Sequence, residues 1–395
     1  MKSIAAINSK SSWLRVKFGD VVRLSKARSQ DPLADGFERY VGLEHLEPGD
    51  LRIRSWGNVA DGVTFTSVFQ SGQVLFGKRR AYQRKVAVAD FAGVCSGDIY
   101  VLETKDAQVL LPELLRFICQ TDAFFDHAVG TSAGSLSPRT NWTSLADFEF
   151  ALPPINQQLR IVEACEAALE TVAAYESALE AALAYQASLR EQTFSIAGIA
   201  TRLGELVHEI QAGKSVVGVD EPPSSSAEYA VLKVSAVGKR SFLPAESKTL
   251  IKQTDFIDIH SIKAGDVLIT RANTPDLVGL VCLVGEEHKN LMLSDKTLRL
   301  VPIKDAPNRL LLEALRTQAS RQYLKANATG TGGAMKNISQ AKLRDMPIRF
   351  PAKEVRQKYT NQLEVAESTV NSIEVRHTNA KTVARVAIDD FLGRH

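Results

Sequence analysis

Apolar side chains recur every three or four residues in two long stretches of the chain, which is the pattern of an amphipathic helix. A proline precedes each stretch and stops the strand before it. In the first stretch the recurring residues are Val162, Cys165, Leu169, Val172, Leu179 and Leu183, with a polar break near Glu176. In the second they are Leu363, Ala366, Val370, Ile373, Ala380, Ala384, Ala387 and Phe391, with His377 where an apolar residue is expected. The pattern predicts two long helices.

The two predicted helices have similar lengths and matching apolar stripes. A helix of about 40 residues is about 60 Å long at 1.5 Å per residue. A helix of this length needs a partner that buries its stripe, because tertiary packing rather than propensity holds most helices together. The simplest prediction is that the two helices pair as a coiled coil. The alternative is that each helix packs on the globular domain that it follows.

The segments outside the helices form an internal repeat. Six short segments return later in the same order: residues 18–22 as 203–207, 72–76 as 265–269, 96–102 as 294–300, 130–134 as 330–334, Asn141 as Asn337, and 150–153 as 348–351. The period is about 200 residues, whereas solenoid units run about 20–50 residues. The repeat therefore predicts two duplicated domains of the α+β class, each followed by one long helix.

Composition restricts the class of protein. The 395 residues are 45% hydrophobic and 24% charged, which is typical of a globular protein with two or three domains. The N-terminus has no apolar run long enough for a signal peptide, and no later segment approaches the length of a membrane span, so we expect a cytoplasmic protein with no membrane partner. The four cysteines lack CxxC spacing and nearby histidines, which argues against a zinc site and a disulfide framework. A net charge of +3 does not by itself indicate nucleic-acid binding.

Local charge is more informative than net charge. Residues 78–85 hold five basic side chains together with a tyrosine and a glutamine: Lys78, Arg79, Arg80, Tyr82, Gln83, Arg84 and Lys85. Such a loop can bind phosphates and present an arginine or an amide to a base edge. The alternative is a basic loop that only faces water. The equivalent segment of the second repeat offers Arg271, Asn273 and Thr274, and different residues in equivalent loops fit two different half-sites.

A glycine-rich loop in each repeat is the second candidate surface. Small residues let a backbone approach a phosphate, and Arg139 and Asn141 in the first copy, with Lys336 and Asn337 in the second, are candidate DNA contacts. The alternative is a turn before the last strand in which the two asparagines act as caps. We expect Arg139 and Lys336 to contact DNA before either asparagine.

Catalytic motifs do not emerge from the sequence. Residues 213–215 (GKS) resemble the end of a phosphate-binding loop, but the first glycine of that motif would fall at His208. We therefore predict that Lys214 belongs to the DNA-facing surface of the second domain. Neither Pro-Pro pair is part of an Asn/Asp-Pro-Pro-Tyr methyltransferase motif, and no nuclease-type cluster is evident. Catalysis is expected to reside in other subunits.

One segment carries a family resemblance. Residues 150–161 (FALPPINQQLRI) resemble the Leu-Pro-Pro-Leu-x-Glu-Gln-x-x-Ile boundary of the specificity subunits of type I restriction-modification enzymes. Gln157 stands where the family usually has Glu. The second copy, residues 350–357 (FPAKEVRQ), lacks the second proline and needs a shift of one residue to align Gln357. The repeated order of domain, glycine-rich loop and long helix extends the resemblance over nearly the whole chain.

The resemblance implies a non-catalytic subunit that reads a split site in double-stranded DNA. Residues 1–152 and 198–351 would be its two target-recognition domains, and residues 153–197 and 352–395 would form an antiparallel coiled-coil spacer. The implied partners are two modification subunits and, with them, restriction subunits. S-adenosylmethionine, ATP and magnesium would be bound by those partners, so no cofactor is expected on this chain.

Two other functions stay open. One is the specificity subunit of a related defence or type II-like methylation system, which differs only in its partners. The other is a coiled-coil scaffold for protein interaction with no DNA role, which predicts no salt-dependent affinity for duplex DNA.

Overall fold

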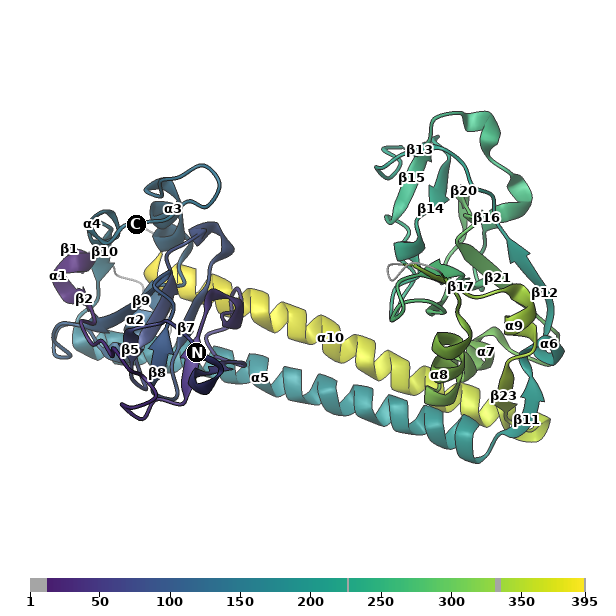
Figure 1. Cartoon of the computed structure of the whole chain (residues 1–395), viewed down its shortest axis with the longest axis horizontal. Coiled ribbons are helices and arrows are strands. Elements are labelled where there is room, and N and C mark those ends of the chain that lie inside the picture. The colour runs from purple at the N-terminus through teal and green to yellow at the C-terminus, as the bar shows by residue number, and fades with distance from the viewer. Residues whose placement is uncertain (1–12, 226, 331–334, 394–395) are drawn as a thin grey trace, which may run out of the picture. The chain divides into compact units, whose positions relative to one another are not determined.

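The computed structural model describes residues 13–225, 227–330 and 335–393. The chain divides into two compact units, one made of the residues up to Ala178 together with those from Ile373, and the other of Leu179–Ser372. Each unit therefore combines one globular part with a portion of both long helices (Figure 1).

The first unit is built on two four-stranded sheets and one strand pair. The antiparallel sheet has the order β2 (Val22–Leu24), β9 (Ile99–Thr104), β6 (Val74–Gly77), β7 (Val86–Val88). The mixed sheet has the order β4 (Gly57–Asn58), β3 (Arg39–Val41), β8 (Gly93–Cys95), β5 (Ser67–Phe69), and β3 runs parallel to β8. Strand β1 (Leu14–Lys17) pairs with β10 (Glu149–Leu152). The helices are α1 (Phe18–Val21), α2 (Pro112–Ile118), α3 (Asp122–Gly130) and α4 (Trp142–Ala146), with 3-10 turns η2 (Leu43–His45), η3 (Val59–Asp61) and η4 (Ala81–Gln83).

Aromatic side chains form the core of the first unit. Phe18 of α1, Phe76 of β6 and Phe124 of α3 are fully buried, and the Phe124 ring lies 5.0 Å from that of Phe18 and 5.5 Å from that of Phe76. All four residues of β6 are buried, as expected for a central strand that is covered on both faces. This core fixes the end of β6, where the basic loop begins.

The second unit repeats most of these elements and adds a fifth strand to its mixed sheet and a second strand pair. Its sheets have the orders β12 (Val207–Ala212), β21 (Thr297–Pro302), β17 (Val267–Thr270), β19 (Val281–Leu283), and β13 (Gly218–Val219), β15 (Ser247–Leu250), β14 (Ala230–Leu232), β20 (His288–Met292), β16 (Ser261–Ile262). Strand β11 (Ile199–Arg202) pairs with β23 (Pro347–Phe350), and β18 (Ala272–Asn273) pairs with β22 (Lys336–Asn337). The helices are α6 (Leu203–Leu206), α7 (Asn308–Leu315), α8 (Gln318–Asn327) and α9 (Gln340–Arg344), with short turns η5 (Gln192–Ile196), η6 (Val234–Ala236), η7 (Gln253–Asp255), η8 (Asp258–His260) and η9 (Lys353–Val355).

The predicted duplication is confirmed by the turns and by the strand order of the antiparallel sheets. Gly72 and Gly265, which the repeat aligns, both adopt a φ of 87° in the turn before β6 and β17. A side chain at either position would be strained, because this backbone conformation favours glycine. The sheet order β2-β9-β6-β7 matches β12-β21-β17-β19 strand for strand.

The two long helices, α5 (Ile155–Glu191) and α10 (Arg356–Leu392), pair in antiparallel fashion. In the first unit, Ile161 and Cys165 of α5 share a buried cluster with Ile388 and Leu392 of α10. In the second unit, Leu189 near the end of α5 shares a cluster with residues near the start of α10, including Leu363. These clusters also contain residues of the globular parts, so the predicted helix pairing and the alternative of packing on a domain both hold. Among the described residues, no helix is both long and apolar enough to span a membrane.

Candidate nucleic-acid interface

In the first unit the structure brings the two candidate loops together. Arg79 of the basic loop and Arg139 of the glycine-rich loop form an antiparallel bridge. The Arg80 N–H donates to Pro138 O at 2.7 Å, and the Thr140 N–H donates to Lys78 O at 3.0 Å. Two segments that lie about 60 residues apart in the sequence therefore form one surface, joined by main-chain hydrogen bonds.

The basic loop has an unusual backbone. Arg80 (φ 53°) and Arg84 (φ 56°) are the only residues other than glycine with a positive φ in the described parts of the chain. They flank η4, which presents Tyr82 at 55% exposure. Left-handed conformations of non-glycine residues cost free energy and concentrate at functional sites.

The five basic side chains of this loop divide into two groups. Arg84 donates to Asp122 Oδ1 at 2.6 Å and to Gln120 O at 3.1 Å, and its guanidinium lies 4.4 Å from the Phe125 ring centre. Lys85 Nζ donates to Leu43 O at 2.6 Å. Arg84 and Lys85 therefore hold the loop against the domain.

The other three basic residues lie at the junction with the glycine-rich loop. Lys78 Nζ sits 4.7 Å from the Tyr100 ring centre. Arg79 and Arg80 both donate to Ser137 Oγ, at 3.0 and 3.3 Å. Half-buried Gln83 has no side-chain hydrogen bond to the residues that the structure describes. Arg79 and Arg80 are thus bound to the glycine-rich loop, whereas Arg84 and Lys85 are bound to other parts of the domain.

Asp98 organises the arginines of this surface, and the sequence analysis missed it. Its Oδ1 accepts from Arg139 Nε at 2.8 Å, and its Oδ2 accepts from Arg139 Nη2 at 3.3 Å and from Arg79 Nη1 at 3.4 Å. The hydrogen bond from Arg139 lowers the pKa of Asp98, against the effect of burial. The signal was present in the repeat, because the aligned segments 96–102 and 294–300 place Asp98 opposite Lys296.

The second unit has the same main-chain frame with different side chains. β18 and β22 pair so that Ala272 faces Asn337 and Asn273 faces Lys336. The Arg271 N–H donates to Lys296 O at 2.8 Å, as the Lys78 N–H donates to Asp98 O at 3.0 Å in the first unit. Arg271 is therefore the counterpart of Lys78, and Lys296 that of Asp98.

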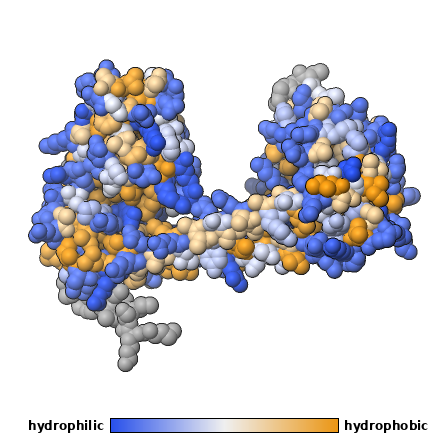
Figure 2. Space-filling view, turned by 90° about the horizontal axis from the view of Figure 1, so that it is seen from below, coloured by the Kyte–Doolittle hydropathy of each residue, from blue (hydrophilic) through white to orange (hydrophobic). Residues whose placement is uncertain are grey.

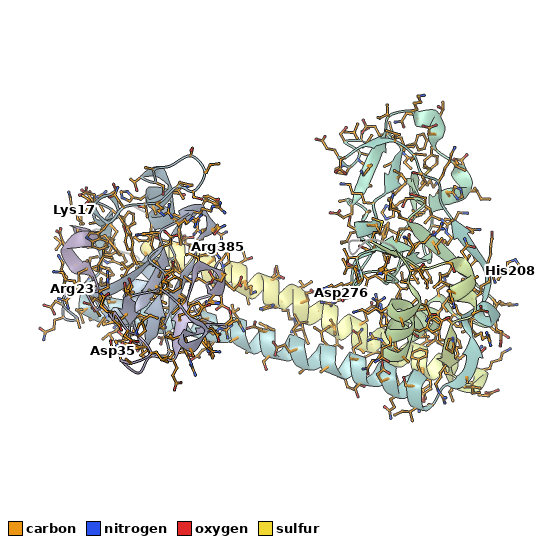
Figure 3. All side chains as sticks on the ribbon, in the orientation of Figure 1. Lys17, Arg23, Asp35, His208, Asp276 and Arg385 are labelled. Atoms are coloured by element: carbon orange, nitrogen blue, oxygen red, sulfur yellow. The ribbon has the colours of Figure 1, made fainter. Side chains whose placement is uncertain are left out.

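The predicted contacts of the second unit gather at this frame. Arg271 and Thr274 are exposed, and Asn273 Oδ1 accepts from the Thr274 N–H at 2.8 Å. Lys336 Nζ donates to Gly330 O at 3.2 Å. Asp276, labelled in Figure 3, accepts from Lys325 Nζ at 2.9 Å, and this contact lowers the pKa of Asp276. The predicted loop residues Thr331, Gly332, Gly333 and Ala334 lie outside the described residues.

The two candidate asparagines, Asn141 and Asn337, have different structural roles. Asn141 is the N-cap of α4, and its Oδ1 accepts from the Ser144 N–H at 2.8 Å, which supports the capping alternative. Ser339 caps α9 in the same way. The counterpart of Asn141 is therefore Ser339, and the predicted pairing of Asn141 with Asn337 in the repeat is wrong by two residues. Asn337 is exposed and lies in β22.

Lys214 is exposed and lies two residues after the end of β12. The glycine before it has a packing reason, because a Cβ on Gly213 would lie 2.1 Å from Leu293 O. This close approach explains the glycine without a phosphate-binding loop. Within the residues that the structure describes, no group of three or more His, Cys, Asp or Glu side chains could hold a metal ion.

The sequence and the fold were compared with those of known proteins, and the similar proteins come from type I restriction systems. No protein-family model matches the sequence. The specificity subunit of the type I restriction enzyme EcoEI of Escherichia coli is 32% identical over 164 residues, which are 41% of this chain and 28% of that protein. The EcoDI specificity subunit of Escherichia coli is 30% identical over 175 residues, which are 42% of this chain and 36% of that protein. Each similarity thus spans less than two fifths of the curated relative.

A solved structure extends the likeness to nearly the whole chain. It comes from work on the structural basis of complex assembly and conformational transition of the type I R-M system. The two chains have a TM-score of 0.59 at 19% identity, over 96% of this chain and 98% of the other. At this level of identity the likeness is one of fold.

Proposed function

We infer that the chain belongs to the specificity subunits of type I restriction-modification systems, and that it binds double-stranded DNA at a split site. Local similarity to two such subunits and a likeness of fold over 96% of the chain support this assignment. In this proposal the chain recognises DNA, and catalysis belongs to its partners.

The duplicated surface carries the proposal. In each unit, the loop after a buried strand (β6 or β17) meets the loop before a short capped helix (α4 or α9) through main-chain hydrogen bonds. In the first unit this frame carries Lys78, Arg79, Arg80 and Arg139, and in the second unit it carries Arg271, Asn273, Lys336 and Asn337. Arginine, lysine and amide side chains are the groups that bind phosphates and read base edges. One frame with two sets of side chains fits two different half-sites.

The proposed contacts follow from this placement. In the first unit they are Lys78, Arg79, Arg80, Tyr82, Gln83 and Arg139, with Arg84, Lys85 and Asn141 in supporting positions. In the second unit they are Lys214, Arg271, Asn273, Thr274, Lys336 and Asn337. Phosphate contacts would supply most of the affinity, and the amides and arginines would supply selectivity.

The helices have the partner-binding role in this proposal. Residues 1–152 and 198–351 act as recognition domains, and residues 153–197 and 352–395 as the spacer that sets the half-sites about one turn of DNA, or ~34 Å, apart. Tyr185, Val365, Val375 and Val383 expose 60–66% of their surface on α5 and α10, and Figure 2 shows apolar side chains in orange among the polar ones along these helices. Where exposed apolar side chains form a contiguous patch, the patch marks a site of protein contact.

A shallow groove in the second unit adds to that surface. It has a volume of ≈ 420 Å³ and is lined by Ala182, Tyr185, Asn361, Gln362, Val365, Ala366 and Thr369. We propose that two modification subunits bind along the helices and that restriction subunits join them in the cytoplasm. S-adenosylmethionine, ATP and magnesium would act on those subunits.

The test is the pattern of methylated bases in cells that carry this chain with its modification subunit, compared with cells that lack this chain alone. A split methylated motif that disappears with the chain is expected. Exchange of residues 1–150 for another recognition domain should then change only one half of the motif. A motif that persists without the chain, or an exchange that alters neither half, would overturn the proposal. A partner that joins methylation and cleavage in one polypeptide would instead indicate a type II-like system.

A further inference from the structure

The Arg139 side chain is held in a geometry that leaves one edge of its guanidinium available. Asp98 engages Nε and Nη2 of Arg139 side-on, at 2.8 and 3.3 Å. Nη1 of Arg139 makes no hydrogen bond within the described residues, and 49% of the side chain is exposed. The edge formed by Nη1 and Nη2 therefore has donors that can reach a ligand outside the domain.

The backbone of Arg139 is fixed as well as its side chain. Arg139 exchanges two main-chain hydrogen bonds with Ala133, at 2.9 and 3.0 Å, and forms a bridge with Arg79 on its other side. Asp98 itself is held by its carbonyl, which accepts from the Lys78 N–H, and by its own N–H, which donates to Ser96 Oγ at 3.2 Å. An arginine that is fixed before binding loses less conformational entropy when it binds.

Two parallel N–H donors at the end of a guanidinium match the O6 and N7 acceptors of guanine in the major groove. We propose that Arg139, oriented by Asp98, reads a guanine in the half-site bound by the first unit. This inference rests on the proposed DNA-binding function and names one base that the site must contain. Asp98 is a positioning residue in this scheme, and Arg139 is the group that touches the base.

The second unit supports the pairing of these two residues. Asn337 bridges Thr329 and Ala272 in the way that Arg139 bridges Ala133 and Arg79, so Asn337 is the counterpart of Arg139. The counterpart of Asp98 is Lys296. Where the arginine is absent, the orienting carboxylate is absent too. Asn337 has no guanidinium, so the second unit needs no carboxylate at position 296. A lysine at that position adds attraction for phosphate.

The test is selection of bound duplexes by the full chain, co-expressed with its modification subunit, from a pool in which both half-sites are randomised. The variants are Arg139→Lys, which keeps the charge but loses the two-donor edge, and Asp98→Asn, which keeps the shape but loses the charge. Glu149→Gln is the matched control, because it removes the carboxylate partner of another exposed arginine, Arg15, at 2.9 Å in the same unit.

We expect the wild-type chain to select a guanine at one position of one half-site. Arg139→Lys should reduce discrimination at that position by about tenfold or more, and Asp98→Asn should reduce it in the same place, while the other half-site and the Glu149→Gln control keep the wild-type preference. A split motif whose preferences are unchanged by both variants would overturn this inference and leave the proposed function standing. Selection of no motif by the wild-type chain would overturn both.

Discussion

Arg190 of α5 donates to Glu313 of α7 at 2.6 Å, and the Glu313 side chain has no exposed surface. Arg316 approaches the other carboxylate oxygen at 3.1 Å and Arg309 at 3.8 Å. Arg309 also pairs with Glu367 of α10. This buried charge cluster joins the globular part of the second unit to both long helices.

Removal of the Glu313 charge should destabilise the second unit strongly. Glu313→Gln leaves three arginines around a neutral group, and loss of one partner of a buried ion pair costs about 3–5 kcal/mol. We expect the free energy of unfolding, measured by chemical denaturation, to fall by about this amount. Glu149→Gln, at an exposed pair, is the control and should have little effect. A Glu313→Gln protein as stable as the wild type would contradict this account.

The same cluster predicts a loss of stability in acid. Burial opposes ionisation of Glu313, but the charges of Arg190, Arg316 and Arg309 outweigh it and lower the pKa of Glu313. A carboxylate with a lowered pKa stabilises the folded state above its unfolded pKa, about 4.3, and loses that contribution as the pH falls below it. Unfolding free energies measured from pH 6 down to pH 3 should fall less steeply for Glu313→Gln than for the wild type. Parallel curves would contradict the prediction.

Glu176 should anchor the segment from Asp50 to Arg54 on α5. Arg52 and Arg54 donate to its carboxylate at 2.7 and 2.8 Å, and both also pair with Asp50. In Glu176→Gln we expect faster amide hydrogen exchange in this segment, with little change in global stability, because the pairs are partly exposed. High salt should produce the same effect in the wild type. Unchanged exchange would show that packing, rather than charge, holds the segment.

Glu176 also shows which features of α5 can be predicted from the sequence and which cannot. The three- and four-residue spacing predicted α5, and the burial of Val162 and Cys165 follows it. A carboxylate in that stripe looks like an interruption, because its partners, Arg52 and Arg54, lie more than 120 residues earlier. Local periodicity describes one helix face and carries no information on which distant side chains will reach it.

In the candidate interface, too, the sequence predicted local features but not the contacts between distant residues. Charge density identified the segment around Arg79, and the repeat identified its counterpart. The sequence could not separate Arg84 and Lys85 from Arg79 and Arg80. The groups that bind Arg84 and Lys85 lie 36–42 residues away in the sequence and are brought close only by the fold. Asp98 could not be predicted from the local sequence, because a single carboxylate forms no motif with its sequence neighbours. Its partners, Arg79 and Arg139, are brought to it only by the fold.

The four cysteines should resist alkylation in the folded protein. Cys95, Cys119, Cys165 and Cys282 are buried free thiols. Burial raises the pKa of Cys95, Cys165 and Cys282 to about 12 and raises that of Cys119 as well. The reactive thiolate is therefore scarce near neutral pH. Mass spectrometry after iodoacetamide treatment should find no modified cysteine in native protein and four in denaturant. Rapid labelling of one native cysteine would show that its segment opens.

The basic surface of the first unit should contribute measurably to the salt dependence of DNA binding. Each phosphate contact releases counterions, so the slope of log K against log salt changes by about 0.9 per contact with duplex DNA. Replacing Arg79 and Arg80 together by alanine should weaken binding and make the slope shallower by up to about 2 units, if each contacts one phosphate. Arg15→Ala is the matched control, because Arg15 is an exposed arginine of the same unit that pairs with Glu149 outside both candidate loops. Fluorescence anisotropy with a labelled duplex, recorded over a range of salt concentrations, measures both quantities. Equal slopes for the double variant and the wild type would mean that these arginines stabilise the loop through Ser137 without touching the backbone of DNA.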